Sequence, residues 1–177
     1  MGNNRYKHLI VLSYFFLALQ ANAHVQNEGN IGVDLGYQQS NGGEASSYVY
    51  GVFGGYKFDE RWNWNIGLQS LGNLKGNGIE VDGWLQYSTI RYSHRLSHDW
   101  SLYSGVGMSF WSIDKHASSL RDSDKGISPV LDFGGEYILN DRLSTTVGYR
   151  FINDIGNEDT IGSFDSHSVI LSLKYWL

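Results

Sequence analysis

Residues 168–177 read SVILSLKYWL, and nearly every second side chain in this stretch is apolar. Because successive side chains of a β-strand point to opposite faces, the stretch predicts a strand with two unlike faces. One face mixes serines, a lysine, an isoleucine and a tryptophan. The other face is wholly apolar and would contact lipid if the strand crossed a membrane. It consists of Val169, Leu171, Leu173, Tyr175 and Leu177.

The same alternation recurs seven times between residue 30 and this last stretch. It predicts eight strands of about ten residues, which is the length that a tilted membrane strand needs. The first seven predicted strands lie within residues 31–38, 48–58, 62–69, 83–94, 100–111, 131–137 and 143–151.

The connections between these strands alternate in length. Short turns at 59–61, 96–99 and 140–141 follow the even-numbered strands, and polar loops at 39–47, 72–80, 112–125 and 153–166 follow the odd-numbered strands. Short periplasmic turns and longer extracellular loops are typical of outer-membrane barrels. Since lipid satisfies no backbone group, an open sheet edge is excluded. The sequence therefore predicts an all-β fold: an eight-stranded, antiparallel, up-and-down transmembrane β-barrel.

The N-terminal residues have the three parts of a secretory signal. Arg5 and Lys7 precede an apolar run at 9–19, and Ala21-Asn22-Ala23 gives a small-x-small cleavage pattern. The alternative is a membrane anchor, but the run is shorter than the roughly 20 residues that span a bilayer. We therefore expect residues 1–23 to be a signal peptide and 24–177 to be one barrel domain of a Gram-negative bacterium.

Composition argues against several classes of function. Without the two basic residues of the signal, 11 basic residues face 18 acidic ones, a net charge of −7. An acidic chain is not expected to bind nucleic acid. The chain has no cysteine, and its histidines are scattered without ligand spacing, so we expect no metal and no cofactor. The acids Asp154, Glu158, Asp159 and Asp165 could bind Ca²⁺ or cationic partners, but a solvated acidic loop explains them more simply.

The inward faces of the predicted strands are rich in Gly, Ser, Thr and Asn, with Tyr103, Trp111 and Trp176. This predicts a filled interior and not a wide pore. Charges in such an interior need partners, so we expect a network of ion pairs and water. The inward charges are Asp34, Arg91, Asp132, Glu136, Arg150 and Lys174.

Several short motifs resemble the transmembrane domain of the outer membrane protein A family. They are GISPV at 126–130, GGEY at 134–137, LSTTVGYRFINDIG at 143–156, TIG at 160–162, FGGY at 53–56 and LG at 71–72. The resemblance covers residues 30–177. It implies a monomer in the outer membrane, surrounded by lipid and lipopolysaccharide, with loops open to host-cell or phage contacts. It also implies delivery by periplasmic chaperones and the barrel-assembly machinery. Relatives often carry a C-terminal peptidoglycan-binding domain, which we do not expect here.

The resemblance also implies an interior ion-pair gate. Arg91 matches the family's gate lysine and Glu136 one gate glutamate, whereas Asn65 and Thr146 stand where the family has a glutamate and an arginine. The Arg91–Glu136 pair is therefore expected to be either a rewired gate or a structural pair. The C-terminal strand is the one that the assembly machinery reads, and it ends in Leu177 where such barrels usually end in Phe.

Three functions follow from these observations. The first is a structural outer-membrane barrel that interacts through its extracellular loops. The first alternative is a narrow ion-conducting pore gated by interior charges. The second alternative is a lipid-modifying enzyme that uses His167 and Ser168 beside Asp165. Adjacent strand residues point to opposite faces, so we do not expect His167 and Ser168 to act together or the protein to be an enzyme.

Overall fold

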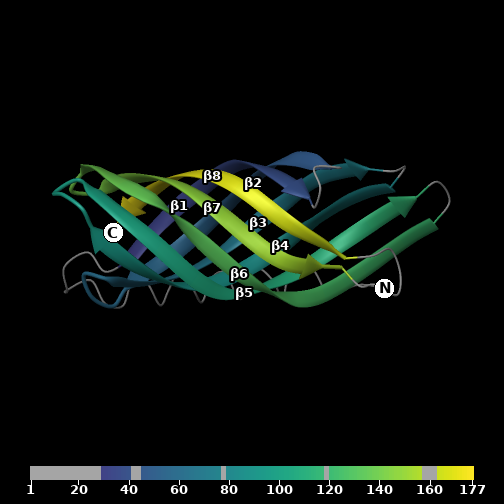
Figure 1. The fold of residues 1–177 in the computed structure, drawn as a ribbon, viewed down its shortest axis with the longest axis horizontal. Coiled ribbons are helices and arrows are strands. Elements are labelled where there is room, and N and C mark those ends of the chain that lie inside the picture. The colour runs from purple at the N-terminus through teal and green to yellow at the C-terminus, as the bar shows by residue number, and fades with distance from the viewer. Residues whose placement is uncertain (1–28, 41–44, 77–78, 118–119, 157–162) are drawn as a thin grey trace.

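The protein is a closed barrel of eight antiparallel strands in chain order (Figure 1). A computed structural model describes residues 29–40, 45–76, 79–117, 120–156 and 163–177. The predicted fold class is confirmed. The strands are β1 (Gly29–Ser40), β2 (Ser46–Lys57), β3 (Trp62–Gly76), β4 (Ile79–Arg95), β5 (Trp100–Ala117), β6 (Leu120–Asn140), β7 (Leu143–Ile155) and β8 (Phe164–Trp176).

Closure comes from pairing between the first and last strands. β1 pairs antiparallel with β8 from Asn30↔Trp176 to Ser40↔Ser166. The two ends of the barrel differ. The turn end holds the short connections after β2, β4 and β6, and the hairpin end holds the β3–β4 and β5–β6 hairpins. Closure leaves no strand edge open in the wall of the barrel, which is the condition for crossing hydrocarbon.

The alternation of β8 divides inside from outside as the sequence predicts. Its apolar series, from Val169 to Leu177, is exposed on the isolated barrel, whereas Ser168, Ser172 and Lys174 are buried. Exposed aliphatic side chains on the other strands continue this outer band. The band includes Val33, Leu35, Val52, Ile90, Val106, Met108, Leu131 and Val147.

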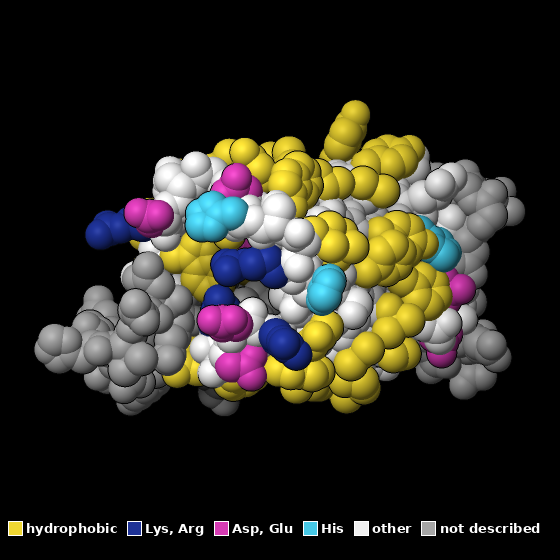
Figure 2. Space-filling view, turned by 60° about the vertical axis from the view of Figure 1, so that its left-hand side comes forward, with side chains coloured by type: hydrophobic (Ala, Val, Ile, Leu, Met, Phe, Trp, Pro, Cys, Tyr) yellow, Lys and Arg dark blue, Asp and Glu magenta, His cyan; other side chains and the backbone are white. Residues whose placement is uncertain are grey.

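Aromatic side chains border the aliphatic band on both sides. Towards the turn end, Trp62 packs on Tyr92 and Trp100 on Tyr137, with ring centroids 5.2 and 4.9 Å apart. Towards the hairpin end, Tyr50 packs edge-on against Trp84 at 5.6 Å. Figure 2 shows the yellow apolar wall behind a turn end rich in charged side chains. Two aromatic belts around an aliphatic band match a membrane with two interfaces.

The prediction of strands about ten residues long is wrong, because the strands have 12 to 21 residues. The loops predicted at 72–80 and 112–125 are mostly strand, since pairing continues to Gly76↔Ile79 and Ala117↔Leu120. The connections predicted at 39–47 and 153–166 are also shorter than predicted, because β1 extends to Ser40 and β7 to Ile155. Polar composition suggested loops, but strand pairing uses backbone groups and continues beyond the membrane.

A bulge in β3 changes the phase of its alternation. The register with β4 shifts between Ser70 and Gly72, and Gly72 has a φ of 65°. A positive φ is a conformation that glycine adopts readily. Ser70 and Leu71 are both buried as a result, and Leu74 then faces inward.

Some expectations fall on residues outside the described ranges. These are the signal peptide at 1–23, the loop acids Glu158 and Asp159, and the motif at 160–162. Within the described ranges, no helix is long and apolar enough to span a bilayer.

Candidate functional site: the barrel interior

Large inward aromatics fit against glycines on neighbouring strands. A Cβ on Gly67 of β3 would lie 2.5 Å from Cζ of Tyr87 on β4. A Cβ on Gly126 of β6 would collide with the Trp111 ring of β5. Tyr87 and Trp111 are almost fully buried. The glycines therefore let aromatic rings fill the interior, as predicted.

Arg91 and Asp132 form a close ion pair in the described interior. Arg91 donates to Oδ2 of Asp132 from Nε at 3.0 Å and from Nη2 at 2.6 Å. The register explains the contact, because Arg91 pairs with Gly105 and Gly105 pairs with Asp132. The glycine between the two side chains leaves room for them to meet. The guanidinium also lies 4.6 Å from the Tyr103 ring centroid.

Arg150 extends this pair into an alternating chain of charges. Its Nη2 lies 4.0 Å from Oδ2 of Asp132, and its Nη1 lies 3.6 Å from Oδ2 of Asp34. Nη1 also donates a hydrogen bond to Gln69, and the guanidinium lies 3.8 Å from the Tyr87 ring centroid. The order Arg91, Asp132, Arg150, Asp34 alternates in sign and sums to zero.

Hydrogen bonds fix the far end of this chain. Asp34 accepts from the Tyr87 hydroxyl at 3.0 Å and from the Ser172 hydroxyl at 2.6 Å. Asp34 is therefore held by β4 and β8 as well as by Arg150 of β7. A buried carboxylate with three partners fits a structural role.

Lys174 and Glu136 form a second pair nearer the turn end. Nζ of Lys174 donates to Oε1 of Glu136 at 2.7 Å, and the Ser144 hydroxyl donates to the same oxygen at 2.6 Å. Trp176 donates to Ser144 at 3.3 Å. The Glu136 side chain keeps 12% of its surface exposed, whereas that of Asp132 keeps 2%.

All six predicted interior charges thus face inward, but the predicted Arg91–Glu136 ion pair is wrong. Arg91 pairs with Asp132 and Glu136 pairs with Lys174. The register gives the reason. Asp132 lies in the same row as Arg91, across one glycine, whereas Glu136 lies opposite Ser101 and Thr146. Asn65 and Thr146 are both buried.

An apolar cluster fills the interior between the charges and the hairpin end; we call it the apolar plug. Its core residues are at most 7% exposed, and Val81 and Phe164 pack against them. The sequence-based prediction did not include it because the predicted third strand ended at residue 69, before Leu71, and because β5 and β7 extend past their predicted ends to Ile113 and Ile152. Unbroken alternation beyond Trp111 and Arg150 was the signal that could have revealed these two residues. The core residues are Phe53, Leu71, Leu85, Tyr87, Trp111, Ile113, Val130, Ile152 and Ile155.

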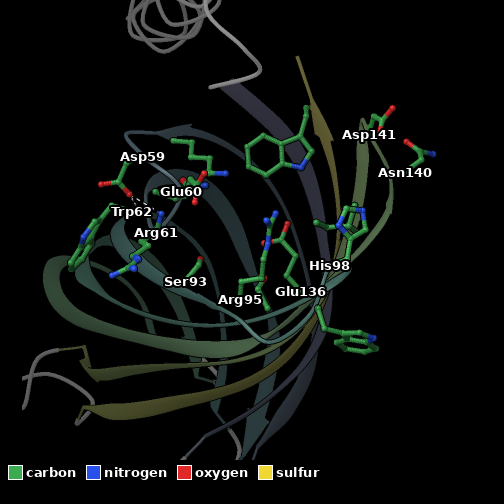
Figure 3. A pocket seen from close by; sticks show the side chains of 16 residues that line it. Asp59, Glu60, Arg61, Trp62, Ser93, Arg95, His98, Glu136, Asn140 and Asp141 are labelled. Atoms are coloured by element: carbon green, nitrogen blue, oxygen red, sulfur yellow. Dashed lines mark hydrogen bonds between the residues drawn. The ribbon is translucent and has the colours of Figure 1, made fainter.

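The turn end opens into a vestibule of about 320 Å³. Figure 3 shows Asp59, Arg61 and Trp62 on one side of it, Asn140 and Asp141 on the other, with Ser93, Arg95 and Glu136 between them. The buried Asn63 also lines it.

One acid at the rim of the vestibule is fixed by its turn. Asp59 accepts from the backbone N–H of Arg61 at 2.7 Å and of Trp62 at 2.9 Å. These two hydrogen bonds hold the pKa of the Asp59 carboxyl below its ordinary value of 3.8.

The residues considered for catalysis are not brought together. Ser168 is buried inside the barrel, and its hydroxyl lies 3.5 Å from that of Ser166. His167 faces outward, where its Nδ1 lies 2.5 Å from the Tyr149 hydroxyl and its ring packs on Phe151. Asp165 instead accepts from the backbone N–H of Asp154 at 3.0 Å. The described residues contain no group of three or more His, Cys, Asp or Glu that could hold a metal.

The chain is similar in sequence to known outer-membrane proteins. A family model described as OmpA-like transmembrane domain matches residues 17–176. Outer membrane protein A of Shigella flexneri is 28% identical over 153 residues, which cover 80% of this chain and 44% of that protein. The counterpart from Escherichia coli O157:H7 is 26% identical, over 80% of this chain and 43% of that protein. The chain thus spans less than half the length of these relatives.

Solved structures share the fold at low sequence identity. Neisserial surface protein A superposes with a TM-score of 0.71 at 13% identity, covering 84% of this chain and 97% of that one. Ail, the attachment invasion locus protein of Yersinia pestis, superposes with a TM-score of 0.54 at 16% identity, covering 85% of this chain and 99% of that one.

The family match and the barrel architecture agree on where the protein resides. The strands cross the outer membrane several times, with the turn end towards the periplasm and the hairpin end outside the cell. Since the family model matches nearly the whole chain, the protein belongs to the OmpA-like transmembrane domain family.

Proposed function

We propose that the protein is a structural outer-membrane barrel that interacts with partners outside the cell through its two long hairpins. The observation that carries the proposal is the unequal length of the strands. β3 to β6 remain paired beyond the membrane, where the β4–β5 ladder continues to Ile79↔Ala117. A paired four-stranded sheet that extends from the membrane offers a rigid surface, which lowers the entropic cost of binding.

The two faces of this extension suit such a role. Outward residues of the β5–β6 hairpin are polar and exposed, among them Ser112, Asp114, Ser123 and Lys125. On its inward face, Ile113 is fully buried and pairs with Asp124. The outer face is therefore free to meet water or a partner, while the inner face stabilises the hairpin.

Proteins of the same fold support a surface role. Neisserial surface protein A is described by its name as a surface protein. Ail is described as an attachment invasion locus protein, and one structure of Ail contains the heparin analogue sucrose octasulfate. A sulfated glycan is therefore a reasonable first probe, although the acidic balance of this chain favours other partners.

The route to the membrane is also a proposal. A signal peptide at 1–23 would direct export, and periplasmic chaperones and the barrel-assembly machinery would deliver the chain. The outward apolar series of β8, which ends at Leu177, would be the strand that this machinery reads. The position of β8 beside β1, at the closing seam, supports this role.

Trimming the β5–β6 hairpin tests the surface role. Residues 113–124 are replaced by Asn-Gly, which joins the paired residues Ser112 and Lys125 through a two-residue turn. Cells that display the full-length or trimmed barrel are compared for binding to immobilised heparin, host extracellular-matrix proteins and a phage panel. We expect at least one binding activity that depends on expression of the full-length protein and is lost on trimming.

A matched control changes the opposite end of the barrel. Asn140→Ala/Asp141→Ala alters the periplasmic β6–β7 turn and should leave surface binding unchanged. Heat-shifted gel migration verifies that each variant is folded. Binding that survives trimming, or expression that confers no binding at all, would contradict the proposed role.

A further inference from the structure

The inward side chains change from polar to apolar along the strands. On β7, Ser144, Thr146 and Arg150 are followed towards the outside by Ile152 and Ile155, all of them buried. On β6, Glu136 and Asp132 are followed by Val130 and then by Ser128, whose buried hydroxyl donates to the Asp154 carbonyl. Because these strands run side by side, the change occurs at similar depth on both.

Other strands complete the apolar half. β4 changes from Arg91 and Thr89 to Tyr87 and Leu85, and β3 continues its inward series with Leu71 and, past the bulge, Leu74. On β5, Trp111 and Ile113 belong to the apolar plug. On the far side, a Cβ added to Gly32 of β1 would collide with the Phe53 ring, so Phe53 reaches across to β1. The apolar plug thus draws on β2 to β7 and approaches β1.

The periplasmic half contains polar atoms that lack partners within the protein. Neither amide atom of Asn30 or Asn65 is hydrogen-bonded, and the Thr89 hydroxyl also lacks a partner. The same is true of Oδ1 of Asp132 and Nε of Arg150. Buried polar groups of this kind require water.

Water has a route to these groups from the periplasm. Asn63 is buried, lines the vestibule and has an Oδ1 without a hydrogen-bond partner. Asn65 follows two residues later on the same inward face of β3. The unpartnered atoms therefore continue inward from the vestibule.

We propose that the barrel interior is a blind well, hydrated from the periplasm up to the charge layer and closed towards the outside by the apolar plug. An ion that left the charges would have to enter a region lined mostly by apolar side chains, which is strongly unfavourable. The barrier to ions is therefore the apolar plug. The ion pairs lie at the inner end of the well, where they stabilise the barrel. This inference is independent of any surface partner.

One strip of the wall at the depth of the apolar plug is polar. Gln38 of β1 and Ser166 and Ser168 of β8 are fully buried there, and both amide atoms of Gln38 lack partners. Other polar groups lie at this depth on β5 and β6: Oδ2 of Asp124, which pairs with Ile113, is buried without a partner, and Ser109 and Ser128 are buried and hydrogen-bonded. The strip on β1 and β8 holds both unpartnered amide atoms of Gln38, so a leak past the apolar plug is expected there first.

Planar-bilayer recording tests the proposal. We expect no resolved conductance from the wild-type barrel or from Arg91→Gln/Asp132→Asn, which neutralises the ion pair without opening the apolar plug. The double variant Leu85→Ser/Ile113→Ser should conduct, because polar side chains would admit water. Heat-shifted migration confirms that each protein is folded before it is recorded.

Three recordings would overturn the proposal. They are wild-type conductance that Gln38→Leu abolishes, conductance that appears only on neutralising Arg91 and Asp132, and silence from the folded double serine variant. The first would mean that the polar strip leaks, the second that the charges are the gate, and the third that the barrier lies elsewhere.

Cysteine labelling gives a second test that does not depend on a serine variant. The wild-type chain has no cysteine, so single cysteines report unambiguously. In the folded barrel, Asn63→Cys and Thr89→Cys should react with a small charged thiol reagent at least an order of magnitude faster than Ile152→Cys. Equal rates at Thr89→Cys and Ile152→Cys would contradict a dry plug above a hydrated well.

Discussion

The periplasmic and extracellular halves of the barrel interior are built on the same strands but stabilised by different interactions. In the periplasmic half, Arg91, Asp132, Arg150 and Asp34 each depend on a partner of opposite sign. In the extracellular half, side chains such as Leu85 and Ile113 fill space without specific partners. Removing one charge leaves its partner unpaired in the interior, whereas removing an apolar group leaves a cavity. The two halves should therefore respond differently to substitution.

The largest expected effect comes from filling the gap between Arg91 and Asp132. A Cβ at Gly105 would collide with Oδ1 of Asp132 and lie 2.8 Å from Cγ of Arg91, so a valine there would push the two paired side chains apart. We expect Gly105→Val to lower the free energy of unfolding by at least about 3 kcal/mol. Urea titration in lipid vesicles, followed by tryptophan fluorescence, measures this change.

Gly135 provides the matched control for this substitution. A Cβ there would lie no closer than 3.9 Å to the atoms around it, which is an ordinary contact. Gly135→Val should therefore fold with nearly wild-type stability. Equal losses at both glycines would show that the effect comes from the backbone and not from the ion pair.

Truncation within the apolar plug should have a somewhat smaller effect. Leu85 is 1% exposed, and Leu85→Ala should cost about 2–4 kcal/mol because it loses transfer free energy and leaves a cavity. Leu102 lies on the outer face at 50% exposure, so lipid can close around Leu102→Ala. The same urea titration should rank Leu85→Ala well above Leu102→Ala. The reverse order would mean that the apolar plug is loosely packed.

The shallower ion pair should be less sensitive than the deeper one. Lys174→Met leaves Glu136 without its cation, but Glu136 keeps the Ser144 hydrogen bond and faces the vestibule. We expect a loss of about 1–3 kcal/mol, because water can replace part of the interaction. A loss greater than that for Arg91→Met would contradict a hydrated vestibule.

The smallest effect is expected at the rim of the vestibule. Asp59→Ala removes the acceptor for two backbone N–H groups of the β2–β3 turn. Because folding lowers the pKa of Asp59, the Asp59 carboxylate stabilises the folded protein above about pH 3.8. This stabilisation is lost as the pH falls through the pKa of Asp59 in the folded protein. The wild-type protein should therefore lose slightly more stability than Asp59→Ala on acidification below pH 4. Parallel pH profiles for the two proteins would rule out this role.

The sequence was sufficient to predict the barrel and the inward position of all six charges. Strict alternation in β8 and its neighbours determines which side chains face inward, and closure determines that every strand is paired. Strand lengths were not predictable from polar composition, because the β3–β4 and β5–β6 hairpins continue their backbone pairing in water.

Ion-pair partners were harder to predict than ion-pair positions. Which charges meet depends on the register across several strands, and alternation along one strand does not contain that information. The Arg91–Asp132 contact requires Gly105 to lie between them, a relation that only the paired sheet reveals. The apolar plug was missed for a different reason, because the predicted strands ended before Leu71, Ile113 and Ile152.

The most direct test of this account is a double-mutant cycle on Arg91 and Asp132, measured by urea unfolding in lipid vesicles. If the pair is a structural element of a closed barrel, Arg91→Met should cost about 3–5 kcal/mol because it leaves Asp132 with only the 4.0 Å contact to Arg150. Arg91→Met/Asp132→Leu should then recover most of that loss. A single variant as stable as the wild-type protein, or a double variant no better than the sum of the two single variants, would contradict a structural role for the charge layer.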